Sequence, residues 1–71
     1  MKQQEILIKL GNRIKKLRLK KDITQNQLAI ECNFEKASMS RIESGKSNVT
    51  ILTLQKISDA LNIPIIDFFK D

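Results

Sequence analysis

The segment EKASMSRIESGK, residues 35–46, has a helical pattern in which one side holds nothing large and apolar. That side carries short or cationic residues: Lys36, Ala37, Ser40, Arg41 and Ser44. A helix with short outward side chains can come close to another molecule. The Lys and Arg beside them can then donate hydrogen bonds to acceptors on its surface. The pattern favours close recognition of a polar, negatively charged partner.

Residues for catalysis are scarce in this chain. It has no His, the most common general base, and no paired carboxylates at a useful spacing accompany a nucleophile. Residues 40–47, SRIESGKS, come close to a phosphate-binding P-loop, but Ser40 replaces its first glycine and the segment has a helical pattern. We therefore do not expect an enzyme.

The cysteine content favours neither a disulfide nor a metal site. Cys32 is the single cysteine, so it can form no internal disulfide, and no His is available to complete a zinc site with it. We expect Cys32 to be a small buried hydrophobic residue, and we expect no metal and no cofactor.

The length and the net charge of the chain further limit the possible classes of protein and partner. The chain has 71 residues, of which 41% are hydrophobic, and we interpret residues 1–71 as one domain. The net charge is +5, and residues 1–21 hold eight Lys or Arg against Glu5 alone, which favours a polyanionic partner. No apolar run approaches a membrane span and charges interrupt the N-terminal residues, so we expect a cytoplasmic protein without a membrane partner.

The first two elements that would position these residues are helices. Residues 3–21 carry apolar side chains at spacings of three and four: Ile6, Leu10, Ile14 and Leu17. Thr24 is a good N-cap for a second helix, and Gln27 completes a capping box with it. Asn33 should end that helix, because asparagine tolerates the left-handed conformation.

Three further helices are predicted. The third covers about residues 35–44 and is ended by Gly45. Thr50 should cap a fourth helix that extends through Leu61, and Pro64 should begin a short fifth one. With no alternating strand pattern, we predict an all-α fold of five short helices.

Residues 25–32 and 36–44, joined by a tight turn, have the layout of a helix-turn-helix. In that motif the second helix enters the DNA major groove. Lys36 and Arg41 could reach guanine O6 and N7, and Ala37 could touch a thymine methyl group. An ordinary solvated cationic face is the alternative interpretation of Lys36 and Arg41.

The segment TQNQLAIECNFEKASMSRIESGKSN, residues 24–48, resembles the helix-turn-helix of the XRE family, which includes the lambdoid phage repressors and Cro proteins. Residues 52–69, LTLQKISDALNIPIIDFF, are similar to the two closing helices of that family. The resemblance covers about residues 10–69. It implies a compact five-helix, lambda-repressor-like domain with the helix-turn-helix at about residues 24–44.

The resemblance also implies roles for particular residues. Four fall on base-facing positions: Lys36, Ala37, Ser40 and Arg41. Three fall on positions that contact the DNA backbone: Gln25, Ser44 and Lys46. Arg18 and Glu43 match a buried ion pair, and the sequence supports this pair independently. Glu43 falls on the inward side of its helix, where an unpaired carboxylate would be costly.

The chain also departs from the family pattern. Asn33 stands where the family usually has glycine, and Glu35 stands where a hydroxyl residue usually caps the recognition helix. Glu35 is a weaker cap and brings a negative charge towards phosphate. Ile30 occupies a position that is typically polar and exposed.

The C-terminal residues exceed what the core of a short helix can accept. We interpret four of them as a dimer surface: Ile65, Ile66, Phe68 and Phe69. Contact with a further domain of the protein is the alternative.

The expected function is a sequence-specific regulator that binds double-stranded DNA. We expect a repressor that acts as a homodimer on a palindromic operator, with half-sites about one helical turn apart. Two alternatives stay open: an antitoxin-like interaction module that regulates its own gene and binds a toxin, and a controller of a restriction–modification system. Activation would need a contact with RNA polymerase.

Overall fold

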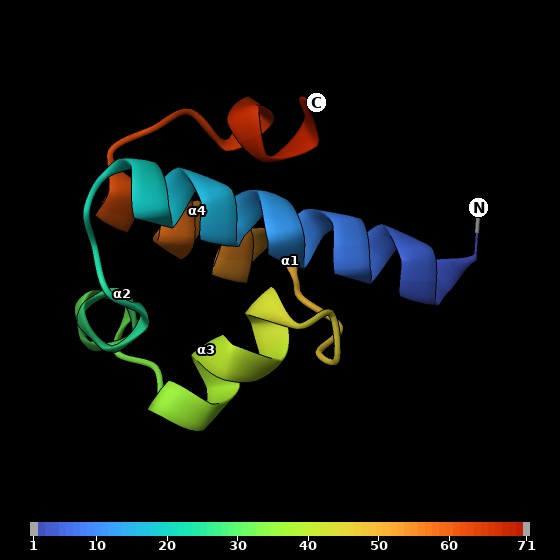
Figure 1. Ribbon diagram of the computed structural model, residues 1–71, viewed down its shortest axis with the longest axis horizontal. Coiled ribbons are helices and arrows are strands. Elements are labelled where there is room, and N and C mark those ends of the chain that lie inside the picture. Colours follow the sequence, from blue (N-terminus) through green and yellow to red (C-terminus); the bar gives the residue numbers. More distant parts are fainter. Residues whose placement is uncertain (1, 71) are drawn as a thin grey trace.

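The computed structural model describes residues 2–70, which form four α-helices and one 3-10 helix and no strand. The elements are α1 (Gln3–Lys20), α2 (Gln25–Cys32), α3 (Lys36–Glu43), α4 (Ile51–Leu61) and η1 (Ile65–Phe69). Helix α1 lies between η1 on one side and the α2–α3 pair on the other (Figure 1). The all-α prediction is confirmed, but the predicted fifth helix is a single 3-10 segment. Five residues suit this tighter helix, which occurs in short pieces.

The predicted helix boundaries are set by local caps. The hydroxyls of Thr24 and Thr50 each accept the N–H of the residue three positions later at 3.1 Å, at the starts of α2 and α4. Asn33 and Asn62 end the same two helices in the left-handed conformation, with φ of 59° and 56°. Asparagine adopts this conformation readily, which explains how Asn33 stands in for the usual glycine.

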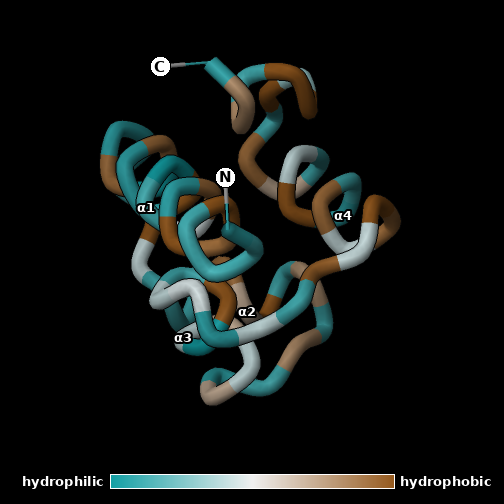
Figure 2. Tube along the Cα trace, turned by 90° about the vertical axis from the view of Figure 1, so that its right-hand side faces the viewer, coloured by the Kyte–Doolittle hydropathy of each residue, from teal (hydrophilic) through white to brown (hydrophobic). Residues whose placement is uncertain are grey.

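The core lies where α1, α2, α3 and α4 meet, and its most deeply buried large residues include Ile14, Leu28, Met39 and Ile57. Figure 2 shows the hydrophobic residues of α4 and η1 as brown stretches. On α1 the predicted apolar stripe is wrong at one position, because Ile6 is 49% exposed. The N-terminal end of α1 projects beyond the other helices, so nothing covers this residue fully (Figure 1).

Cys32 is buried, as predicted, and its Sγ lies 3.7 Å from the backbone oxygen of Lys56. Burial raises the pKa of the Cys32 thiol. The nearby Glu31 carboxylate also raises this pKa, and Lys56 lowers it. The thiol therefore stays protonated and packs as a small apolar group.

The segment η1 corrects the predicted dimer surface. Phe68 is only 3% exposed and belongs to the core, and Ile65 packs partly against it. Ile66 and Phe69 remain 57% and 59% exposed. The 3-10 segment turns Phe68 inward because it folds back on α1, where Arg13 Nε donates to the backbone oxygen of Asp67 at 3.0 Å.

Candidate nucleic-acid interface

Helix α3 has two sides with opposite character. Its inward side is buried and consists of Met39, Ile42 and Glu43. Its outward side is exposed and includes every residue predicted to face the bases: Lys36, Ala37, Ser40 and Arg41. Two of these side chains, Ala37 and Ser40, are short, so another molecule can approach the backbone of α3 closely there, and the other two positions carry cationic groups.

The turn between α2 and α3 is hydrogen-bonded to α2 and packed against the core. The Phe34 N–H donates to the backbone oxygen of Ala29 at 2.8 Å, and the ring of Phe34 packs against the core. Lys56 Nζ lies 5.7 Å from the centroid of this ring, within the range of a cation–π contact. Glu35 is the N-cap of α3 but makes no side-chain capping hydrogen bond. The first N–H groups of α3 therefore have no capping side chain.

A buried ion pair fixes α3 against α1. Arg18 Nε donates to Glu43 Oε2 at 2.7 Å, and Arg18 Nη2 donates to Glu43 Oε1 at 3.0 Å. The two side chains are only 6% and 4% exposed. This two-point contact is geometrically well defined, and it places Arg18 and Glu43 together as the sequence analysis expected.

Gln25, the first residue of α2, lies beside this pair. Its Nε2 donates to Glu43 Oε1 at 3.1 Å, and the residue is half-buried. The sequence analysis predicted a contact of Gln25 with the DNA backbone. The hydrogen bond to Glu43 was missed, because the two residues are 18 positions apart and no local pattern joins them.

The segment after α3 carries the remaining residues that were predicted to contact the DNA backbone. Ser44 and Lys46 are exposed, and the hydroxyl of Ser44 donates to the backbone oxygen of Arg41 at 3.1 Å. Gly45 between them has a φ of +78°, which favours glycine, and the backbone of Ile8 on α1 leaves no room for a Cβ there. Glycine at position 45 therefore allows this segment to pass close to α1.

Gly11 is a further residue that the sequence analysis missed. A Cβ at this position on α1 would lie 2.5 Å from the backbone oxygens of Ile42 and Glu43. Only glycine allows the end of α3 to come so close to α1. A glycine inside a strong helical pattern was the available signal, since it costs helix stability and needs a packing reason.

A metal site and a membrane-spanning helix can also be looked for within residues 2–70. No group of three or more His, Cys, Asp or Glu side chains could hold a metal ion there. In the same part of the chain, no helix combines the length and the apolar character needed to span a bilayer.

The paired helices α2 and α3, with an exposed and partly cationic α3, are the architecture of a DNA-binding helix-turn-helix domain. Residues 14–68 match the model of the helix-turn-helix family HTH_3. The chain belongs to this family, the XRE-type helix-turn-helix transcriptional regulators.

Several individual proteins are similar to the chain over most of its length. The chain is 40% identical over 68 residues to the control protein C.MunI from a Mycoplasma species, which covers 94% of this chain and 92% of that protein. It resembles the restriction–modification controller C.AhdI from Aeromonas hydrophila with a TM-score of 0.86 and 30% identity, over 89% of this chain and 96% of that one. The controller C.Esp1396I, solved as a tetramer with its natural 35-base-pair operator, has a TM-score of 0.81 and 38% identity, over 90% and 84%.

Proposed function

We propose that this chain is a controller of a restriction–modification system, which binds operator DNA as a homodimer and regulates transcription from the adjoining promoter. The exposed outward side of α3 carries the proposal, because Lys36, Ala37, Ser40 and Arg41 can all reach a major groove from it. The relatives favour the controller over the two other functions expected from the sequence. C.MunI matches nearly the whole length of both chains.

The proposed contacts divide into two kinds. Lys36 and Arg41 donate to guanine edges, while Ala37 and Ser40 allow close approach and contact neighbouring bases. Gln25, Ser44 and Lys46 lie at the two ends of the motif, where they contact phosphates and set its register on the duplex. A protein that binds duplex DNA must be in the same compartment as that DNA. The proposed function therefore agrees with the cytoplasmic location expected from the sequence.

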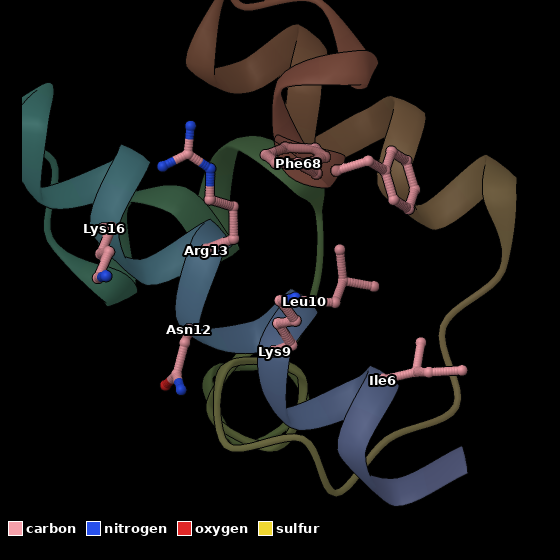
Figure 3. A pocket seen from close by; sticks show the side chains of 8 residues that line it. Ile6, Lys9, Leu10, Asn12, Arg13, Lys16 and Phe68 are labelled. Atoms are coloured by element: carbon pink, nitrogen blue, oxygen red, sulfur yellow. The ribbon is translucent and has the colours of Figure 1, made fainter. Parts of the chain in front are cut away.

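The proposed dimer packs through Ile66 and Phe69, the exposed residues of η1. Phe69 borders a groove of about 440 Å³ between α1 and η1, with Ile6, Leu10 and Phe68 also among its lining residues (Figure 3). The apolar half of this groove gives a second subunit surface to cover. The rest of the groove is lined by polar and cationic residues: Lys9, Asn12, Arg13 and Lys16. Two cationic domains joined in this way would present their α3 helices to successive major grooves.

In this proposal the protein can either repress or activate transcription. Binding that overlaps a promoter represses it, and activation would require an added contact with RNA polymerase. An antitoxin-like role would instead place an unrelated protein on Ile66 and Phe69, and co-purification of such a protein with the chain would favour that role.

Selection from a random duplex DNA library, at near-physiological salt, tests DNA reading directly. We expect enrichment of a two-fold symmetric site with half-sites about one turn, or roughly 34–36 Å, apart. Arg41→Ala should change the selected site, whereas the control Lys20→Ala, which removes the same charge from the end of α1, should not. Folded wild-type protein that enriches no sequence would refute the proposal.

Sedimentation of the purified protein tests the dimer surface. The double variant Ile66→Ser and Phe69→Ser should sediment as a folded monomer where the wild type is a dimer. Leu52→Ser is the control, because Leu52 on α4 is an equally apolar residue and is 76% exposed. A monomer produced by Leu52→Ser alone would move the interface to the start of α4.

A further inference from the structure

We infer that Glu43 is a positioning residue for DNA binding, which orients the carboxamide of Gln25 for a phosphate contact. The buried ion pair would then set DNA affinity as well as holding α1 to α3. This inference rests on the proposed function, since it assumes that the outer side of the α2 and α3 pair meets DNA.

The orientation of Gln25 follows from the chemistry of its partner. A carboxylate only accepts hydrogen bonds, so Glu43 can pair with the amide nitrogen of Gln25 but not with its amide oxygen. Glu43 Oε1 accepts from Gln25 Nε2 at 3.1 Å and from Arg18 Nη2 at 3.0 Å. The carboxamide is thereby fixed in one of its two possible flips.

This orientation leaves a donor for DNA. A primary amide nitrogen has two N–H groups, and Glu43 takes one of them. Gln25 is only half-buried, and it is the first residue of α2, where backbone N–H groups without helical partners also favour an anion. The second N–H of Gln25 can therefore donate to a phosphate that approaches this end of α2.

Arg18 completes the arrangement in two ways. Its guanidinium compensates the charge of Glu43, which would otherwise repel a phosphate near Gln25. Its Nη1 also donates to the backbone oxygen of Ile23 at 2.8 Å, in the loop that leads into α2. The same pair thus holds the Gln25 side chain and the loop from which α2 begins.

Side-chain amide relaxation by NMR tests the orientation in the free protein. We expect the Gln25 amide group to be far more ordered than that of the exposed Gln4 at the start of α1, whose order parameter should fall below about 0.6. Equal mobility of the two groups would overturn the inference. This measurement needs no DNA and no variant, so it does not depend on whether a Glu43 variant folds.

A double-mutant cycle tests the coupling to affinity, with Gln25→Ala, Glu43→Gln and their combination compared below the unfolding transition of each. Gln25→Ala should weaken operator binding about twofold to tenfold, the worth of one hydrogen bond. Glu43→Gln should cost a similar factor alone but almost nothing further in the Gln25→Ala background. A merely structural role for Glu43 would give independent, multiplying losses and would overturn the inference.

The two proposals fail in different ways. If the wild type binds no duplex, the proposed function fails, and this inference fails with it. If the wild type binds its operator and Gln25→Ala binds equally well, only the positioning role of Glu43 is overturned.

Discussion

The two sides of α3 have opposite character within one short helix. Met39, Ile42 and Glu43 face inward and are buried, while Lys36 and Arg41 face outward and are exposed. Eight residues therefore serve two purposes, since one side holds the domain together and the other stays open to a partner. Substitutions on the inward side should mainly change the free energy of unfolding, and those on the outward side should mainly change DNA binding. Substitution of Glu43, which we propose to act on DNA binding through Gln25, should change both.

The largest effect is expected from Arg18→Ala. Removing one partner of a buried ion pair leaves Glu43 buried and uncompensated, which should lower the free energy of unfolding by about 3–5 kcal/mol. Thermal or urea unfolding would measure this loss. If Arg18→Ala keeps wild-type stability but loses DNA affinity, Arg18 acts in DNA recognition and not in holding the domain together.

Gly11→Ala should have the next largest effect. The added methyl group would press against the backbone oxygens at the end of α3, which cannot move aside as a flexible side chain would. We expect a loss of about 1–3 kcal/mol in unfolding free energy, as in overpacked cores. Asn12→Ala, at the exposed neighbouring position, is the control and should leave the unfolding midpoint nearly unchanged. Unaltered stability in Gly11→Ala would contradict the tight contact.

Arg41→Ala tests the outward side. It should cost on the order of 1–3 kcal/mol in operator binding and relax the preference at one base position, while the unfolding midpoint stays near that of the wild type. Binding measured against a set of operators with single base changes would show this. An equal loss on every operator would remove the base-reading role from Arg41.

Lys46→Ala should have the smallest and least selective effect. As a phosphate contact, Lys46 should contribute similarly to binding of all sequences, and its loss should lower the salt dependence of log K by about 1. Titrations at several salt concentrations, on operator and on unrelated duplex, would measure both quantities. A loss confined to the operator would instead assign Lys46 to the bases.

The parts of the structure that local rules govern could be predicted from the sequence. Thr24 and Thr50 cap their helices, Asn33 adopts the left-handed conformation, and Cys32 is buried. Each outcome depends on a residue type and its immediate neighbours. The exposure of the α3 positions predicted to face bases follows from the helical period in the same way.

Features that depend on contacts between distant segments were missed by the sequence analysis or predicted wrongly. Nothing in adjacent Phe68 and Phe69 says which one turns inward, because a five-residue 3-10 segment has no long apolar period. Ile6 fits the α1 stripe but is half exposed, and it belongs to the N-terminal end of α1, which projects beyond the other helices (Figure 1). The contacts of Gly11 with α3 and of Gln25 with Glu43 join residues far apart in sequence, so only the folded chain shows them.

The central position of α1 has a consequence for the operator. Gly11 meets α3 and Arg13 holds η1, and two residues apart on a helix is roughly 160° around its axis. In a dimer that packs through η1, one helix width then separates the subunit contact from the reading helix, with no flexible linker between them. In such a dimer, the α1 backbone would set the distance between the two half-sites, and no residue that touches a base would be needed to fix it.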